Sequence, residues 1–341
     1  MLAKFREGDL IETFDGNIFD VKGLTHPPRN VIAFISYTPN ETGDRKRGNV
    51  IYQKVYPLHE RYELLQKKFP QYLIHDPVFN EWLCEVPINA IKHHYKSEHY
   101  LRKLRQKTQL TQLEAAALNF AEVLKKNSEI PWNTLGISGS LLVGLHTPKS
   151  DIDIIVYGSQ NCHRVYDSLK TLVNNRSNQV KSYNTEELEH LFDFRSKDTN
   201  ISFEDFVRSE SRKLSQGTFR SYDYFIRFVK DWNEINDQYG TVYYQTVGYA
   251  KIKCQVTDDS QMIFTPCHYK IDDVKIIGGP TIEPIQEIVS FRGRFCEQAR
   301  NSEFVLAQGK LEKIQRKGAR VYYRLLLGNK VSDYMILTKG T

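Results

Sequence analysis

The chain has few cysteines and no long apolar run. Its five cysteines lie apart in the sequence and form no Cys-x-x-Cys pair, which argues against a zinc knuckle or a redox motif. No apolar stretch approaches the length needed to cross a bilayer, and the N-terminus turns polar too soon for a signal peptide. No internal repeat or low-complexity tract occurs. We therefore expect a cytoplasmic protein with reduced thiols.

The composition is typical of a globular protein with ample core material. Hydrophobic residues make up 40% of the 341 residues and charged residues 26%, and this length suffices for two or three domains. The net charge of +6 is modest but unevenly distributed. The most basic stretch, residues 92–107, carries Tyr95 and Tyr100 among its charges. Such a pattern occurs on nucleic-acid-binding surfaces and equally in solvated linkers.

A glycine-serine turn followed by two aspartates carries the chemistry. Gly139 and Ser140 follow a predicted strand over residues 134–138, and Asp151 and Asp153 begin the next strand. Alternate side chains of a strand share a face, so the two carboxylates project together and can hold Mg²⁺. A helix starting at the turn offers free N–H groups to phosphate. The combination predicts phosphoryl or nucleotidyl transfer, whereas an isolated Asp-x-Asp is more often a polar edge strand.

This stretch resembles the signature of the DNA polymerase beta-like nucleotidyltransferases. The matching residues are Gly139, Ser140, Gly144, Ser150, Asp151 and Asp153. Val143 departs from the basic or aromatic residue that many members carry before the second glycine. The motif covers only residues 134–157 and therefore describes one domain. The sequence is also similar to a group of archaeal proteins that are predicted nucleotidyltransferases.

The resemblance implies a reaction supported by two Mg²⁺ ions. Asp151, Asp153 and a third carboxylate would hold the metals, and the glycine-serine turn would clasp the phosphates of a nucleoside triphosphate such as ATP. An acceptor hydroxyl would then attack the α-phosphorus and release pyrophosphate. We expect the third acid to be Asp223, which lies in a predicted strand over residues 222–229. The other candidates are Asp193, Asp231, Glu234 and Asp258.

Four further residues are candidates for nucleotide binding. Ser150 and Lys149 directly precede the aspartate pair, and Arg212 and Lys213 flank the expected cleft. Each has an ordinary alternative, because a loop lysine or the end of a helix is often simply solvated.

We expect an α+β fold in three parts. A β-rich N-terminal domain covers residues 1–104, with a hairpin at Asp15-Gly16 and a helical, irregular segment over 58–107. The catalytic core, a mixed sheet with helices, covers 105–238 and begins with a helix capped by Thr111 and Glu114. A small β-barrel or sandwich covers 239–341. Its first strands are predicted over 242–244 and 250–256, with a hairpin turn at 258–260.

The nature of the acceptor is left open between three hypotheses. The first is an enzyme that adds a nucleotide to RNA, suggested by basic residues beside aromatic strands. The second is nucleotidylation, such as AMPylation, of a protein or a small molecule. The third is a non-catalytic nucleotide- or RNA-binding module, against which the intact pair of aspartates argues.

Overall fold

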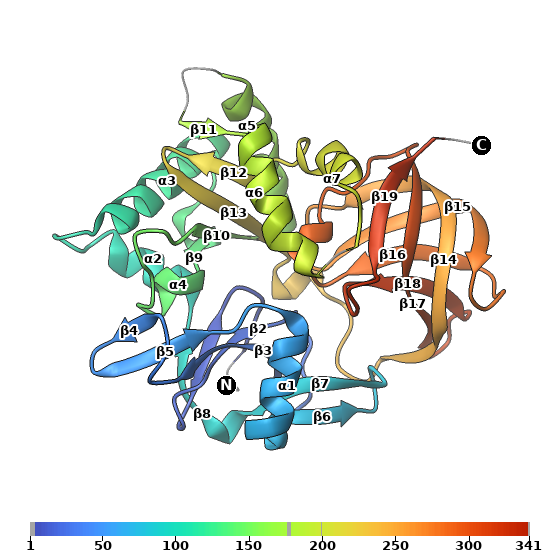
Figure 1. The fold of residues 1–341 in the computed structure, drawn as a ribbon, viewed down its shortest axis with the longest axis horizontal. Coiled ribbons are helices and arrows are strands. Elements are labelled where there is room, and N and C mark those ends of the chain that lie inside the picture. Colours follow the sequence, from blue (N-terminus) through green and yellow to red (C-terminus); the bar gives the residue numbers. More distant parts are fainter. Residues whose placement is uncertain (1–3, 176–178, 199, 340–341) are drawn as a thin grey trace. The chain divides into compact units, whose positions relative to one another are not determined.

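We describe a computed structural model that covers residues 4–175, 179–198 and 200–339 (Figure 1). By contacts the chain divides into two compact units. The first comprises Met1–Ile74, Trp82–Ser182 and Leu214–Asn236, and the second comprises His75–Glu81, Tyr183–Lys213 and Asp237–Thr341. Among the described residues, no helix has the length and apolarity that a membrane crossing requires.

The first unit begins with a curled antiparallel sheet. Its strands are β1 (Leu10–Thr13), β2 (Ile18–Val21), β3 (Asn30–Pro39), β4 (Arg45–Arg47), β5 (Val50–Lys54), β6 (Leu73–Asp76), β7 (Glu81–Pro87) and β8 (Ile91–Tyr95). The main path runs β4-β5-β3-β2-β1-β8, and β7 pairs with β3 and β6. The helices α1 (Leu58–Lys68) and α2 (Ser97–Leu104) belong to the same part of the chain. The β1–β2 hairpin at Asp15-Gly16 is confirmed.

A five-stranded mixed sheet forms the rest of the first unit, in the order β11-β12-β13-β10-β9. Its strands are β9 (Leu135–Ile137), β10 (Ile152–Tyr157), β11 (Val180–Lys181), β12 (Gln216–Phe219) and β13 (Tyr222–Val229). The central strands β10 and β13 are parallel, and the other pairs are antiparallel. The single-turn helix α4 (Gly139–Leu142) connects β9 toward β10.

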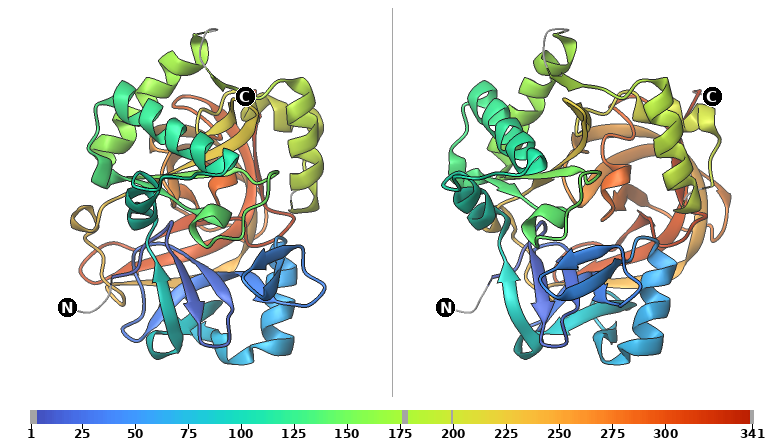
Figure 2. Two further views of the ribbon diagram at one scale, coloured as in Figure 1. Left: turned by 90° about the vertical axis from the view of Figure 1, so that its left-hand side faces the viewer. Right: turned by 60° about the vertical axis from the view of Figure 1, so that its left-hand side comes forward.

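Two long helices pack against one face of this sheet, α3 (Gln112–Ser128) and α5 (Ser159–Asn174) (Figure 2). The predicted capping box of Thr111 and Glu114 starts α3. Ile152, Ile154 and Val156 alternate toward the core and are fully buried. The other face of β10 meets the N-terminal sheet: a Cβ on Gly8 would lie 2.9 Å from Ile155 Cγ1. Strand β10 is therefore covered on both faces.

The second unit contains a closed β-barrel (Figure 1). Its strands are β14 (Val242–Gln261), β15 (Cys267–Gly278), β16 (Ile285–Ser290), β17 (Phe304–Arg316), β18 (Tyr322–Leu327) and β19 (Tyr334–Thr338). The ring β14-β15-β16-β18-β17 closes because β17 also pairs with β14. The helices α6 (Thr185–Arg195) and α7 (Phe203–Glu210) belong to this unit. The α+β class with its β-rich ends is confirmed.

Short 3₁₀ turns complete the described structure. They are η1 (Pro70–Tyr72), η2 (Ile88–Ala90), η3 (Trp132–Thr134), η4 (Ser196–Asp198), η5 (Trp232–Glu234) and η6 (Gly293–Phe295).

Two expectations about local structure are wrong. Residues 58–107 are not only helical and irregular, because β7 and β8 form strands that pair with β3 and β1. Residues 242–256 are not two short strands followed by a turn at 258–260, because β14 runs unbroken to Gln261. Its register shifts on both sides of Asp258, so these polar residues occupy β-bulges. Bulges and turns favour similar residues, so the local sequence does not tell them apart. Pairing with distant strands decides whether a polar segment is a bulge or a turn.

Phe120 of α3 anchors the helix layer to the sheet. It is 0% exposed, and its ring lies 4.7 Å from Phe219 and 4.8 Å from Tyr224, measured between ring centroids. We expect Phe120→Ala to lower the free energy of unfolding by about 3–5 kcal/mol. All three tryptophans (Trp82, Trp132 and Trp232) lie in the first unit, so urea unfolding followed by tryptophan fluorescence reports on it.

Phe14, which is 71% exposed, provides the control for this measurement. Phe14→Ala is expected to change the free energy by no more than about 0.5 kcal/mol. Equal losses in the two variants would contradict the anchoring role of Phe120.

Candidate active site

Asp151 and Asp153 lie at the start of β10, on the face that meets the N-terminal sheet. Asp153 pairs with Phe225 of β13 and Ile155 pairs with Arg227. Because directly paired residues share a face, Asp153, Phe225 and Arg227 lie on the same side of the sheet. Both aspartates are half-buried. The expected projection of two carboxylates from one strand face is thus present in the backbone geometry.

The turn at Gly139 packs directly against Asp153. The Ser138 N–H donates to the Asp153 carbonyl oxygen at 2.9 Å, which ties the end of β9 to β10. Gly139 has φ +63°, and a Cβ there would overlap the Asp153 Oδ2 and lie 2.8 Å from its Cγ. Glycine is therefore required both by its backbone conformation and by the space that the carboxylate occupies.

Ser140 presents a buried hydroxyl beside this turn. The residue is buried, and its Oγ has no hydrogen-bond partner among residues 4–175, 179–198 and 200–339. A buried hydroxyl normally finds a partner, so an unpaired one directly after Gly139 is consistent with a site for an external ligand. Leu142 and Val143, which follow in the chain, pack against Tyr37 and Tyr52 of the N-terminal sheet.

The N-terminal sheet supplies charge to the face of the aspartates. Lys54, at the end of β5, interacts electrostatically with both aspartates and lies with its Nζ 4.0 Å from the ring centroid of Tyr56. Arg227 Nη1 bonds to Glu7 at 2.8 Å and lies 3.5 Å from Asp20 Oδ1. Lys22 in turn contacts Glu7 and Asp20, at 3.2 and 2.5 Å.

Asp153 is electrostatically strained by this arrangement. Burial first, and then the nearby Asp151 carboxylate, raise the pKa of Asp153 to about 7, although Arg227 and Lys54 oppose the rise. Asp20 behaves in the opposite way: burial raises its pKa, but Lys22 and Arg227 outweigh this and hold the pKa of Asp20 below its ordinary value. The pair therefore lacks positive charge that a bound cation would supply.

Ser150 and Lys149 occupy the loop that leads into β10. The buried Ser150 Oγ accepts from the Thr147 N–H at 2.9 Å, so its hydroxyl fastens the loop. The Lys149 side chain is exposed, and the backbone N–H of Lys149 donates to Thr147 Oγ1 at 3.3 Å. The expected phosphate contacts of these two residues stay predictions.

Asp223 lies at the exposed start of β13, opposite Thr218 of β12. Continuing the β10–β13 register by one residue places it beside Asp151, on the shared face. However, no three Asp, Glu, His or Cys side chains of the described residues are grouped closely enough to hold a metal. The role of Asp223 as third acid therefore stays a prediction.

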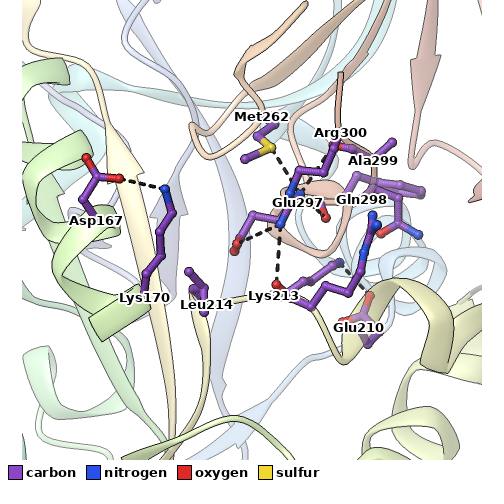
Figure 3. Close-up of polar contacts among 12 residues, drawn as sticks. Asp167, Lys170, Glu210, Lys213, Leu214, Met262, Glu297, Gln298, Ala299 and Arg300 are labelled. Carbon is purple, nitrogen blue, oxygen red and sulfur yellow. Dashed lines mark hydrogen bonds and ion pairs between the residues drawn. The ribbon is translucent and has the colours of Figure 1, made fainter. Parts of the chain in front are cut away.

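Arg212 and Lys213 belong to the second unit, whereas the glycine-serine turn and both aspartates belong to the first. Arg212 makes a two-pronged ion pair with Glu303 at 2.5 and 3.0 Å. The buried Lys213 donates to Glu210 at 2.6 Å (Figure 3). It also donates to the carbonyl oxygen of Arg294 at 2.6 Å. These partners lie within the second unit, and the expected nucleotide contacts of the two residues stay predictions.

Sequence reasoning missed Lys54 as a member of the site. Nothing in its local sequence separates it from other lysines, because it reaches the aspartates only through the packing of the N-terminal sheet. Arg227 carried a weak signal, since its predicted strand placed it on the same face as Asp223.

Comparison with known proteins agrees with this geometry. The model of a family described as "Nucleotidyltransferase domain" matches residues 119–213, which include the turn and both aspartates. The uncharacterized protein MJ1086 of Methanocaldococcus jannaschii is 30% identical over 334 residues, covering 95% of this chain and 96% of the relative. The chain belongs to the DNA polymerase beta-like nucleotidyltransferases. No solved structure matches it. The chemistry implied by the domain is transfer of a nucleoside monophosphate from a nucleoside triphosphate.

The raised pKa of Asp153 predicts a pH-dependent stability. The metal-free folded protein binds this proton more tightly than the unfolded chain does. The proton's contribution to folding stability is therefore complete below about pH 4 and is lost as the pH rises through about 7. Asp153→Asn removes the ionisation, and its melting temperature should exceed that of the wild type increasingly toward alkaline pH. Tryptophan fluorescence across about pH 5 to 8 measures this difference.

Asp167→Asn is the control for this measurement. Asp167 has a side chain 68% exposed that pairs with Lys170 on α5. Its melting curve should follow that of the wild type at every pH. If the difference between Asp153→Asn and the wild type did not change with pH, the shifted ionisation would be contradicted.

The contact between Gly139 and Asp153 predicts the effect of a single methyl group. Gly139→Ala should displace the carboxylate and lower nucleotidyl transfer by roughly 100-fold or more. Gly48→Ala is a matched control, because Gly48 has a similar φ of +60° but no atom within 4 Å of its missing Cβ. Equal transfer rates in the two variants would contradict a role for the contact between Gly139 and the Asp153 carboxylate.

Proposed function

We propose that this protein is a Mg²⁺-dependent enzyme that transfers a nucleoside monophosphate from a nucleoside triphosphate to a hydroxyl group of RNA, with release of pyrophosphate. The observation that carries the proposal is the aspartate pair packed against the Gly139 turn. This arrangement sets two carboxylates beside the backbone turn that connects β9 with α4.

The chemistry of Asp151 and Asp153 suits a divalent cation, although no group of three metal-binding side chains occurs among the described residues. All candidate donors are oxygens, the mutual repulsion of Asp151 and Asp153 calls for positive charge, and Ser140 Oγ has no partner among the described residues. Mg²⁺ held by the two aspartates would supply charge neutralisation and acidify the acceptor hydroxyl. Asp223 is proposed to complete the ligand set, because its register places it beside Asp151.

The protein's own groups bind and orient the triphosphate. The tight turn at Gly139 and the hydroxyl of Ser140 offer donors to phosphate oxygens, and Lys54 adds a cation from the N-terminal sheet. Lys149 is proposed as a further, exposed phosphate contact. Burial of the site lowers the local dielectric and strengthens these contacts.

An RNA acceptor is supported by the C-terminal barrel. The hairpin between β17 and β18 carries the exposed residues Lys317 and Arg320 beside the half-buried aromatic Tyr323. Small closed barrels with basic and aromatic surfaces are common binders of single strands. Arg316 on the same hairpin is already paired with Asp237 at 2.7 Å.

Transfer of a labelled nucleotide tests the proposal. The protein is incubated with Mg²⁺ and each nucleoside triphosphate labelled at the α-phosphate, together with total cellular RNA or total cellular protein. We expect label in the RNA fraction, and a loss of roughly 100-fold or more in Asp151→Asn and Asp153→Asn. A comparable loss in Asp223→Asn would support the third acid.

The exposed Asp167→Asn variant again serves as the control and should transfer label at the wild-type rate. Label in the protein fraction alone would overturn RNA as the acceptor and select protein nucleotidylation. Undiminished transfer by Asp151→Asn would overturn the assignment of the site.

A further inference from the structure

A second site lies in the first unit, in a groove of about 380 Å³. We call it the Trp132 groove. It is formed by the N-terminal segment, by α2 with the residue after it, and by the turn before β9. Its lining residues are Arg6, Glu98, His99, Leu101, Arg102, Arg105, Trp132 and Asn133. Neither the aspartate pair nor the glycine-serine turn contributes to it.

The groove combines an aromatic plane with stacked cations. The Arg105 guanidinium lies 4.0 Å from the centroid of the Trp132 ring. The arginine covers one face of the indole, and a nucleobase would stack on the other face. Trp132 is only half-buried, so part of its surface is accessible.

Arg6 at the groove is fixed before any ligand arrives. It is only 6% exposed, and its guanidinium lies 3.3 Å from the ring centroid of Tyr157 and 4.6 Å from that of Trp232. Its Nη2 pairs with Glu98 at 3.0 Å, whereas its Nε has no hydrogen-bond partner among the described residues. A buried donor without a partner is costly unless a ligand uses it.

The charge of the groove is positive. Glu98 is the single carboxylate of the lining and is already paired with Arg6. Arg102 and Arg105 are exposed and form no ion pair with any described residue. Lys103 continues the positive charge along α2, whereas Lys107 beyond the helix is paired with Glu114 at 2.8 Å. Unpaired arginines next to an aromatic plane suit a ligand that alternates phosphates and bases.

The location separates this groove from the reacting groups. Trp132 precedes β9 and Gly139 follows it, so the groove and the glycine-serine turn lie beyond opposite ends of a three-residue strand, which spans about 10 Å. Tyr157, under Arg6, likewise ends β10, whose beginning carries the aspartates. A ligand in the groove therefore does not compete with the triphosphate.

We infer that the Trp132 groove binds single-stranded RNA of the acceptor, by stacking a base on Trp132 and pairing phosphates with Arg102 and Arg105. This rests on the proposed function for the identity of the strand as acceptor. The groove would hold the strand at a distance from its reacting end and so set the length of acceptor that the enzyme can use.

Binding of a fluorescently labelled single-stranded RNA, without nucleotide, tests the inference. Anisotropy titrations over a series of salt concentrations give the affinity and its salt dependence. Arg102→Ala/Arg105→Ala should weaken binding at least about 10-fold and reduce the slope of log affinity against log salt by about 1.5. Trp132→Ala should weaken binding roughly 5- to 150-fold with little change in that slope.

Matched variants keep this test decisive. Trp132→Phe retains a stacking ring and should bind much more tightly than Trp132→Ala. Lys125→Ala/Lys126→Ala removes the same charge from the last turn of α3, outside the groove, and should bind like the wild type. Because Arg102 and Arg105 are exposed, their double variant remains informative even if Trp132→Ala fails to fold.

Unchanged affinity in the Arg102/Arg105 variant would overturn the inference, as would equal binding of double-stranded and single-stranded RNA. If the groove variants lost ATP binding but kept RNA binding, the inference would also be overturned, in favour of a mononucleotide site. Two outcomes separate this inference from the proposed function. Nucleotide transfer to RNA that the groove variants do not affect would overturn the groove alone. RNA binding that depends on the groove, without any transfer by the wild type, would overturn the proposed reaction alone.

Discussion

The structure of the first unit depends on holding two carboxylates on one strand face against a backbone turn. Asp153 is half-buried between the turn at Gly139 and the N-terminal sheet, where both its burial and Asp151 oppose its negative charge. This cost requires positive charge from elsewhere in the chain, which Lys54 and Arg227 partly supply. The same requirement excludes any side chain at residue 139, because a Cβ would occupy the space of the carboxylate.

The N-terminal sheet is consequently part of the same compact unit as the aspartate pair. Leu10 and Ile18 pack in one cluster with Leu142 and Leu145, which follow the glycine-serine turn. The sheet also carries Lys54 and the pair formed by Asp20 and Lys22. Packing of this kind links the position of the glycine-serine turn to the positions of these charged residues. The three-domain division suggested by the sequence stays an interpretation. By contacts, residues 1–74 belong to the same unit as the sheet that contains β10.

The basic residues of the chain fall into two classes once their partners are known. Arg212, Lys213 and Arg324 are paired with Glu303, Glu210 and Glu312 within the second unit, and such pairs mainly organise that unit. Arg102 and Arg105 of the first unit are exposed and without ion pairs among the described residues. Basic composition alone does not distinguish a structural ion pair from a surface that binds phosphate, whereas the position of carboxylates in space does.

The sequence by itself determined the nucleotidyltransferase motif and the local elements that carry it. The spacing of Gly139, Ser140, Asp151 and Asp153 depends on short-range geometry, as do the capping of α3 at Thr111 and the hairpin at Asp15-Gly16, so local rules predicted all of them. Only the tertiary structure decided that β14 is a single bulged strand, that β7 and β8 join the first sheet, and that Lys54 faces the aspartates. Those outcomes depend on pairing and packing between segments far apart in the chain, and no local pattern encodes which distant partner will bury a given strand or compensate a given charge.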